Sequence, residues 1–112
     1  MGKTSALGSF EELVLLAILR TGEQAYAVSI RRELAERTGR DAAMGAVYAT
    51  LDRLADKDLV TSEIEDRDGT VGRPRRMYRV LPPGLEALAE TRDARTSMWD
   101  GLTVAPPEAH ES

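Results

Sequence analysis

Arginine is concentrated in one short segment of an otherwise acidic chain. The chain has 112 residues and a formal net charge of -4. Between Arg67 and Arg79 there are five arginines and one acid, Asp68, whereas from Glu86 onward there are six acids and two arginines. Guanidinium groups around a glycine- and proline-rich turn suit the binding of phosphate oxygens. The segment is therefore a candidate anion-binding surface, and the alternative is a solvated basic surface without a ligand.

Other kinds of chemistry lack the residues that they need. The chain has no cysteine, which excludes disulfides, thiolate metal sites and thiol nucleophiles. His110 is the only histidine and lies in a polar stretch, so we expect neither a histidine base nor a metal site. Asp66 and Asp68 flank a turn, where acids are more often turn residues than metal ligands. We expect no enzyme activity, no cofactor and no metal.

Length and hydropathy predict one small domain. With 112 residues and 42% hydrophobic residues, the core is thin, and dimerisation would bury more apolar area. The longest apolar run, residues 13–19, is too short to cross a bilayer. The first six residues lack the hydrophobic stretch of a signal peptide. We therefore expect a cytoplasmic protein with no membrane partner.

Hydrophobic periodicity predicts four helices and one β-hairpin, a mainly α fold of the α+β class. Ser9 and Glu12 have the spacing of a capping box, which would start the first helix, and Gly22 would end it. Two stretches of period-two alternation surround a Gly/Pro/Asp-rich turn. The other predicted helices cover about residues 27–38, 45–57 and 85–100, and the strands about residues 60–64 and 75–81.

Three helices followed by an arginine-rich hairpin form the layout of a winged helix-turn-helix. In that layout the third helix enters the major groove of double-stranded DNA, and the hairpin, or wing, lies along the phosphates. Ala46 and Ala49 are small enough for the third helix to approach DNA closely. The candidate DNA-binding residues, which can reach base edges or phosphates, are Tyr48, Thr50, Arg53, Arg73, Arg75 and Arg76.

Other interpretations of these residues stay open. Tyr48 could equally be a core residue whose hydroxyl reaches the surface. Arg53 could pair with a neighbour such as Asp56 on the helix surface. The rival function is a winged helix that serves as a protein-interaction module without binding DNA, and the acidic net charge favours that rival. The clustering of arginine and the composition of the third helix favour DNA.

The chain also resembles the PadR-type transcriptional regulators over roughly residues 7–90. The segments that carry the resemblance are residues 7–19, 26–30, 45–54, 72–80 and 84–85, which include Tyr-Ala-Thr-Leu-Asp-Arg-Leu in the third helix and Gly-Arg-Pro-Arg in the wing. The resemblance implies a homodimer that binds an inverted-repeat operator, usually as a repressor. It also implies that the helix after the wing is the main dimerisation element.

We therefore divide the chain into a DNA-binding domain (residues 1–81), a dimerisation helix (residues 82–102) and a disordered tail (residues 103–112). The helix carries an apolar stripe without an obvious partner in so small a domain. Its proposed dimerisation residues are Leu85, Leu88, Met98 and Trp99.

The short C-terminus resembles a small subgroup of the family. Some members of that subgroup bind flat hydrophobic compounds on a tryptophan between the C-terminal helices of the dimer. The resemblance implies that Trp99 is a platform for a small aromatic effector. In the alternative, Trp99 only packs in the dimer interface and there is no effector.

Three positions depart from the usual pattern of the family. Residues 42–44 are Ala-Ala-Met where Ser or Thr usually precedes the third helix, so a side-chain N-cap is expected to be missing. Asp58 stands where Gly is usual, at a position that favours left-handed backbone. Leu81 stands where Thr is common. These departures affect local stability and leave the expected fold unchanged.

Overall fold

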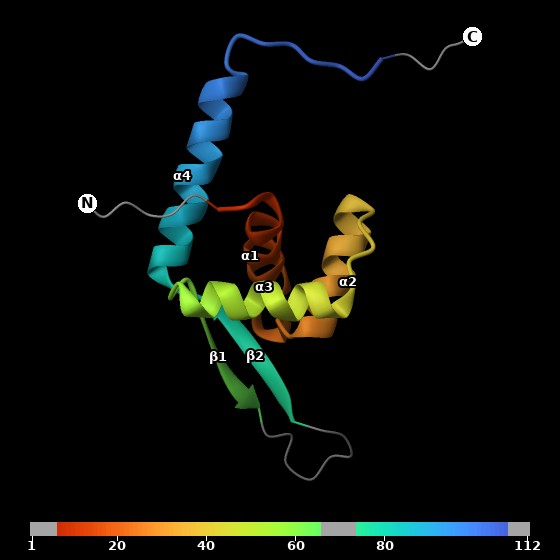
Figure 1. Cartoon of the computed structure of the whole chain (residues 1–112), viewed down its shortest axis with the longest axis vertical. Helices are drawn as coiled ribbons and strands as arrows, with labels where there is room; N and C mark the ends of the chain where they lie inside the picture. Colours follow the sequence, from red (N-terminus) through yellow and green to blue (C-terminus); the bar gives the residue numbers. More distant parts are fainter. Residues whose placement is uncertain (1–6, 66–73, 108–112) are drawn as a thin grey trace.

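A computed structural model describes residues 7–65 and 74–107 of the protein (Figure 1). The elements in chain order are α1 (Ser9–Thr21), the short 3-10 helix η1 (Gly22–Gln24), α2 (Ala27–Thr38), α3 (Met44–Asp56), β1 (Val60–Glu65), β2 (Arg75–Val80) and α4 (Pro82–Trp99). The expected mainly α architecture with one β-hairpin is confirmed. None of the helices in the described part is long and apolar enough to cross a membrane.

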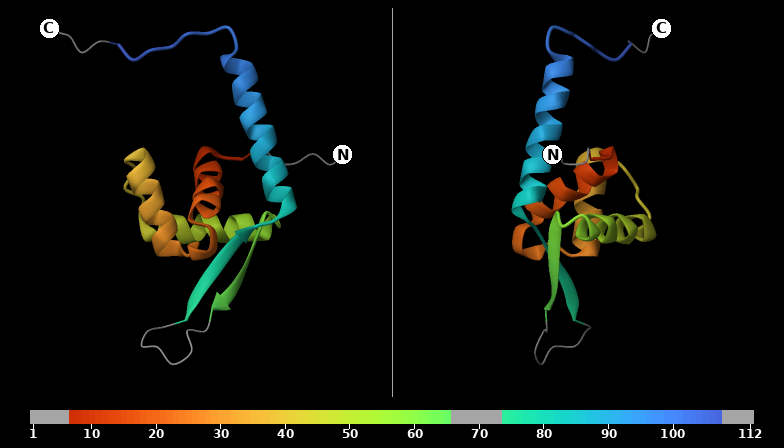
Figure 2. Two further views of the ribbon diagram at one scale, coloured as in Figure 1. Left: turned by 180° about the vertical axis from the view of Figure 1, so that it is seen from behind. Right: turned by 60° about the vertical axis from the view of Figure 1, so that its left-hand side comes forward.

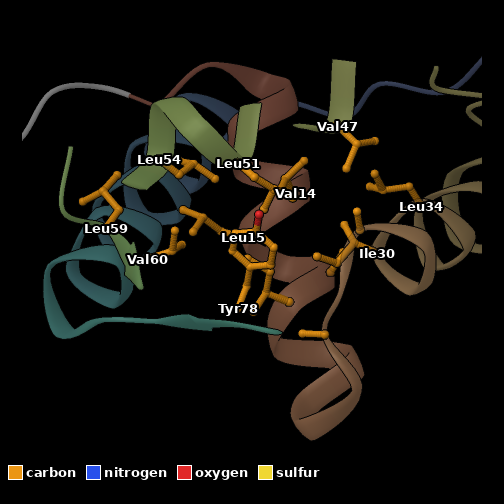
Figure 3. Packing of buried hydrophobic residues seen from close by; sticks show 14 of the residues in the cluster. Val14, Leu15, Ile30, Leu34, Val47, Leu51, Leu54, Leu59, Val60 and Tyr78 are labelled. Atoms are coloured by element: carbon orange, nitrogen blue, oxygen red, sulfur yellow. The ribbon is translucent and has the colours of Figure 1, made fainter. Parts of the chain in front are cut away.

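The core forms around α1, which contacts α2, α3, α4 and β2. Val14 and Leu15 of α1 are fully buried, and Figure 3 shows them among side chains from α2, α3 and the hairpin. The apolar positions predicted for α3 all point into this core: Val47, Leu51 and Leu54 are fully buried. Each such side chain contributes about 1.5–3 kcal/mol of hydrophobic stabilisation.

The first helix is capped one residue earlier than the capping box predicts. Gly8 is the N-cap, and Ser9 is already helical. The backbone N–H of Gly8 donates a hydrogen bond of 2.9 Å to Oε1 of Glu11, the contact that was expected between Ser9 and Glu12. The shift directs the side chain of Glu11 inward, where it is buried.

The hairpin is antiparallel and is anchored to the helices at its root. Val60 pairs with Val80, and β1 becomes more exposed away from this pair. The backbone N–H of Tyr78 donates to the carbonyl of Ala25 at 2.8 Å, which attaches β2 to the segment before α2. The ring of Tyr78 is buried among core residues (Figure 3). Burial raises the pKa of the Tyr78 hydroxyl, and the charges of Asp52 and Tyr48 act in the same direction, while Arg76 opposes them.

Asp58 adopts the left-handed backbone conformation between α3 and β1. Its φ is 62°, and it is the only non-glycine residue with positive φ in the described part of the chain. The backbone turns sharply here so that Leu59 and Val60 enter the core. The expectation that this position favours left-handed backbone is confirmed.

The last helix begins at Pro82, three residues before the predicted start, because proline suits the first helical turn. In Figures 1 and 2, α4 extends away from the body on the side opposite to the hairpin. Its Gly84 is buried where the helix crosses the loop before β1. A Cβ atom added there would meet the carbonyl oxygen of Leu59 and lie 2.7 Å from Cγ1 of Val80. This close approach requires glycine.

We predict that Gly84→Ala destabilises the protein by about 1–3 kcal/mol, because the added methyl group overpacks the junction of α4 and the hairpin. Chemical denaturation checks the effect. Gly45→Ala is the matched control, since Gly45 is also helical but has nothing near its Cβ position. The control is expected to raise stability by about 1 kcal/mol through helix propensity. Equal effects of the two substitutions would contradict the packing argument.

Candidate nucleic-acid interface

One side of α3 is open and lined by small residues. The side opposite to the buried stripe carries Gly45, Ala46 and Ala49, all of which are exposed. In Figure 1, α3 lies across the outside of the helical bundle, and the hairpin projects beyond it. The N-cap residue is Ala43, which makes no side-chain cap, as predicted. The exposed backbone of this helix can therefore come close to a groove of DNA.

Two of the polar residues predicted on this side lie in different environments. Tyr48 is 50% exposed at the edge of the open side, which favours a surface role over a core role. Thr50 is only 1% exposed and does not belong to the open side, which corrects the prediction. Its Oγ1 accepts a hydrogen bond of 3.0 Å from the Arg53 guanidinium. Thr50 is therefore buried, and its hydroxyl oxygen helps to position the Arg53 guanidinium.

Arg53 belongs to a charged cluster that joins α3 to the first turn of α1. Its Nε lies 3.6 Å from Oε2 of Glu11, and its side chain is 56% exposed. Lys57 Nζ donates to both carboxylate oxygens of Glu11, at 3.1 and 3.0 Å. The local pairing of Arg53 with Asp56 is not observed. Local sequence spacing does not indicate this cluster, because Glu11 and Lys57 lie 46 residues apart in the chain.

The ionisation of Glu11 is set by opposing effects. Burial acts to raise the pKa of the Glu11 carboxyl, but the hydrogen bonds from Gly8 and Lys57 and the charges of Lys57 and Arg53 lower it further than burial raises it. The net pKa is therefore below its ordinary value. Glu11 is a buried carboxylate that is held charged by the elements around it.

The wing arginines differ in how they are held. The Arg75 guanidinium stacks over the ring of Tyr26, 4.1 Å from its centroid, where a cation–π contact orients it. Arg76 is exposed and donates a hydrogen bond of 3.0 Å to Oγ of Ser62 across the strands. Arg73 lies outside the described residues. Because Arg75 and Arg76 are consecutive residues of β2, their side chains lie on opposite faces of the hairpin.

The predicted apolar stripe of α4 divides into two parts. Leu88 is 8% exposed and belongs to the core of the domain, which corrects its assignment as an unpartnered residue. Leu85, Met98 and Trp99 are exposed, at 48%, 77% and 54%. Arg95 of α4 pairs with Glu12 of α1 at 2.9 Å. The inner part of α4 is therefore part of the winged-helix body, and its outer part presents apolar side chains.

A groove of about 520 Å³ lies between the hairpin and the end of α1. Leu19 and Met77 supply apolar surface to it, and Glu63 adds a carboxylate. Trp99 is not among its lining residues, so the groove is separate from the predicted effector platform. Within the described ranges, no group of three or more His, Cys, Asp or Glu side chains could hold a metal ion.

Comparison with known proteins identifies the fold as a winged helix. A PadR-like transcription factor from Bacteroides fragilis is 27% identical, with 80% of this chain and 82% of that chain covered and a TM-score of 0.67. A PadR family regulator from Eggerthella lenta is 26% identical, with 80% and 77% covered and a TM-score of 0.65. F93 from STIV, a winged-helix DNA-binding protein, shares the fold at 16% identity, with 87% and 98% covered and a TM-score of 0.68. No curated protein matches the chain.

Residues 15–90 match the transcriptional regulator PadR-like family. The chain belongs to this family and is a DNA-binding transcription regulator, not an enzyme.

We predict that Glu11→Gln lowers the stability near neutral pH by about 2 kcal/mol, because Lys57 and Arg53 lose a charged acceptor. The pKa of Glu11 is lowered by folding, so its contribution is complete at neutral pH and disappears as the pH falls through that lowered value. Denaturation curves of both proteins should therefore converge in acid.

Glu12→Gln is the matched control for this prediction. It removes the neighbouring ion pair with the half-exposed Arg95, and such a pair contributes less than about 1 kcal/mol. A stability difference for Glu11→Gln that persists unchanged in acid would show that the loss is not electrostatic.

Proposed function

We propose that the protein is a cytoplasmic, homodimeric repressor that binds an inverted-repeat operator. In this proposal α3 enters the major groove, and the wing lies along the phosphates. Two observations carry the proposal: the small residues on the open side of α3 are exposed, and the hairpin carries Arg75 and the exposed Arg76. The segregation of charge supports it, because an acidic chain binds DNA only through a surface where cations predominate.

The proposed contacts divide into two kinds. Tyr48 lies at the edge of the open side and can reach a base edge or a phosphate. Arg53 is held by Glu11 and Thr50, which reduces the entropy that its guanidinium loses on binding a phosphate. The wing residues Arg73, Arg75 and Arg76 complete the proposed set. Thr50 is not in it, because its side chain is buried.

Dimerisation through α4 is supported by its exposed apolar residues. Met98 and Trp99 end the helix, and Leu102 and Val104 follow them, all more than half exposed. Exposed apolar side chains that are close in sequence are typical of an interface. We propose residues 1–81 as the DNA-binding domain and residues 82–102 as the dimerisation helix, although Leu88 links the helix to the domain core. Residues 103–107 form neither helix nor strand, and the remainder of the proposed tail lies outside the described residues.

We predict strongly salt-dependent binding to the DNA upstream of the protein's own gene. If each subunit neutralises about three phosphates, the log–log dependence of affinity on salt has a slope near -5 for a dimer. Arg75→Ala and Arg76→Ala should each reduce the magnitude of this slope by about 2 for the dimer. Each should also weaken binding to all sequences alike. Gel-shift titrations at several salt concentrations check this.

Arg92→Ala is the control, because Arg92 is exposed on α4, away from the wing. The slope of log affinity against log salt for Arg92→Ala should match that of the wild type. A wild-type slope near zero would exclude the DNA interface and favour the protein-interaction module. A change of base preference without a change of slope would mean that the wing reads bases.

We predict that Met98→Gln combined with Trp99→Gln raises the dissociation constant of the dimer at least about 30-fold. This factor corresponds to the loss of about 2 kcal/mol of binding free energy from interface side chains. Because both residues are exposed, the domain stays folded. Sedimentation over a range of concentrations checks this. Glu86→Gln with Glu90→Gln replaces two exposed residues of the same helix and should leave the dimer intact. An unchanged dimer in the first variant would refute the assignment.

A small aromatic effector at Trp99 completes the proposal. An exposed indole beside a dimer interface can stack on a flat apolar compound. Because Trp99 is the only tryptophan, its fluorescence reports this site alone. Planar aromatic compounds should quench it saturably at micromolar concentrations, and Trp99→Ala should remove their effect on DNA binding. If no compound quenches the wild type and Trp99→Ala breaks the dimer, Trp99 is a packing residue only.

A further inference from the structure

The open side of α3 carries the exposed carboxylate of Asp52. At 100° per residue, Gly45, Ala49, Asp52 and Asp56 lie roughly opposite to the buried Val47, and all four are exposed. The neighbouring cation, Arg53, is turned toward Glu11. In the described part of the chain, no ion pair involves Asp52.

A carboxylate on this side has few favourable partners in DNA. It repels phosphates, and it accepts hydrogen bonds but cannot donate them when ionised. The donors in the major groove are the N4 amino group of cytosine and the N6 amino group of adenine. Adenine also presents its N7 acceptor beside N6, which repels a carboxylate, whereas cytosine has no acceptor beside N4 in the groove. Cytosine is therefore the base that a carboxylate on this side selects.

We propose that Asp52 is a specificity-determining residue that selects cytosine at one position of each operator half-site. The proposal rests on the proposed function, in which α3 enters the major groove. The small residues Gly45 and Ala49 precede Asp52 on the same stripe. They let the helix approach closely enough for the short aspartate side chain to reach a base edge.

Asp56 lies on the same stripe but is placed differently. It is the last residue of α3, about 6 Å further along the helix axis than Asp52. Recognition helices contact bases mainly with residues nearer their N-terminus. Asp56 therefore lies beyond the base edges, and it provides a control with the same charge on the same stripe.

Selection of bound sequences from a random double-stranded DNA library tests the proposal with the full-length protein. The wild type should enrich cytosine at one position per half-site. Asp52→Asn should change the enriched base to adenine, because an amide can bind N6 and N7 together. Asp52→Ala should bind cytosine and the other bases at that position alike, a loss of about tenfold or more in discrimination. Asp56→Asn removes the same charge and should leave the selected motif unchanged.

The outcomes separate this proposal from the function on which it rests. If Asp52→Ala enriches the wild-type motif, or if Asp56→Asn changes the motif instead, the assignment of Asp52 is overturned while DNA binding stands. If the wild type enriches no sequence, the sequence-specific function fails and the assignment fails with it. Thermal unfolding of each variant confirms that it is folded, as expected for substitutions at exposed positions.

Discussion

The burial of α1 is the constraint on which the rest of the structure depends. A chain of 112 residues has few apolar side chains with which to form a core. The domain buries them by packing three helices and a strand around one helix. Val14 and Leu15 are fully buried as a result. This arrangement leaves α3 with one covered side and one open side. The surface proposed to meet DNA is the side of α3 that the core leaves exposed.

The first turn of α1 connects the two halves of the proposed regulator. Neighbouring carboxylates pair with different parts of the domain: Glu11 holds Lys57, the C-cap residue of α3, and Glu12 holds Arg95 of α4. One turn of α1 therefore makes ion pairs both with the end of α3 and with α4. These carboxylates also offset positive charge close to the proposed DNA surface, which explains how an acidic chain can keep its cations at defined positions.

The helices and strands of this chain follow from its sequence more directly than the partners of its side chains do. The bounds of α2 follow from local signals, since Gly39 ends the helix in the left-handed conformation. The start of α4 is less clear from the sequence, because a proline can either end a hairpin or occupy the first turn of a helix, as Pro82 does. Helical spacing does place Thr50 on the buried side of α3, three residues after Val47 and four before Leu54, so its burial could have been predicted. Periodicity could not show that Leu88 is covered by the core of the domain. The partners of Glu11 likewise depend on how the helices cross.

The attachment of the hairpin at one end has a dynamic consequence. Val60 at its root is buried, whereas residues 63–65 are exposed on both faces. The outer rungs of the ladder are therefore stabilised mainly by their own hydrogen bonds, and their amides exchange with solvent by local opening at a lower free energy than the root requires. The outer part of the hairpin can therefore open locally while its root stays packed against the core.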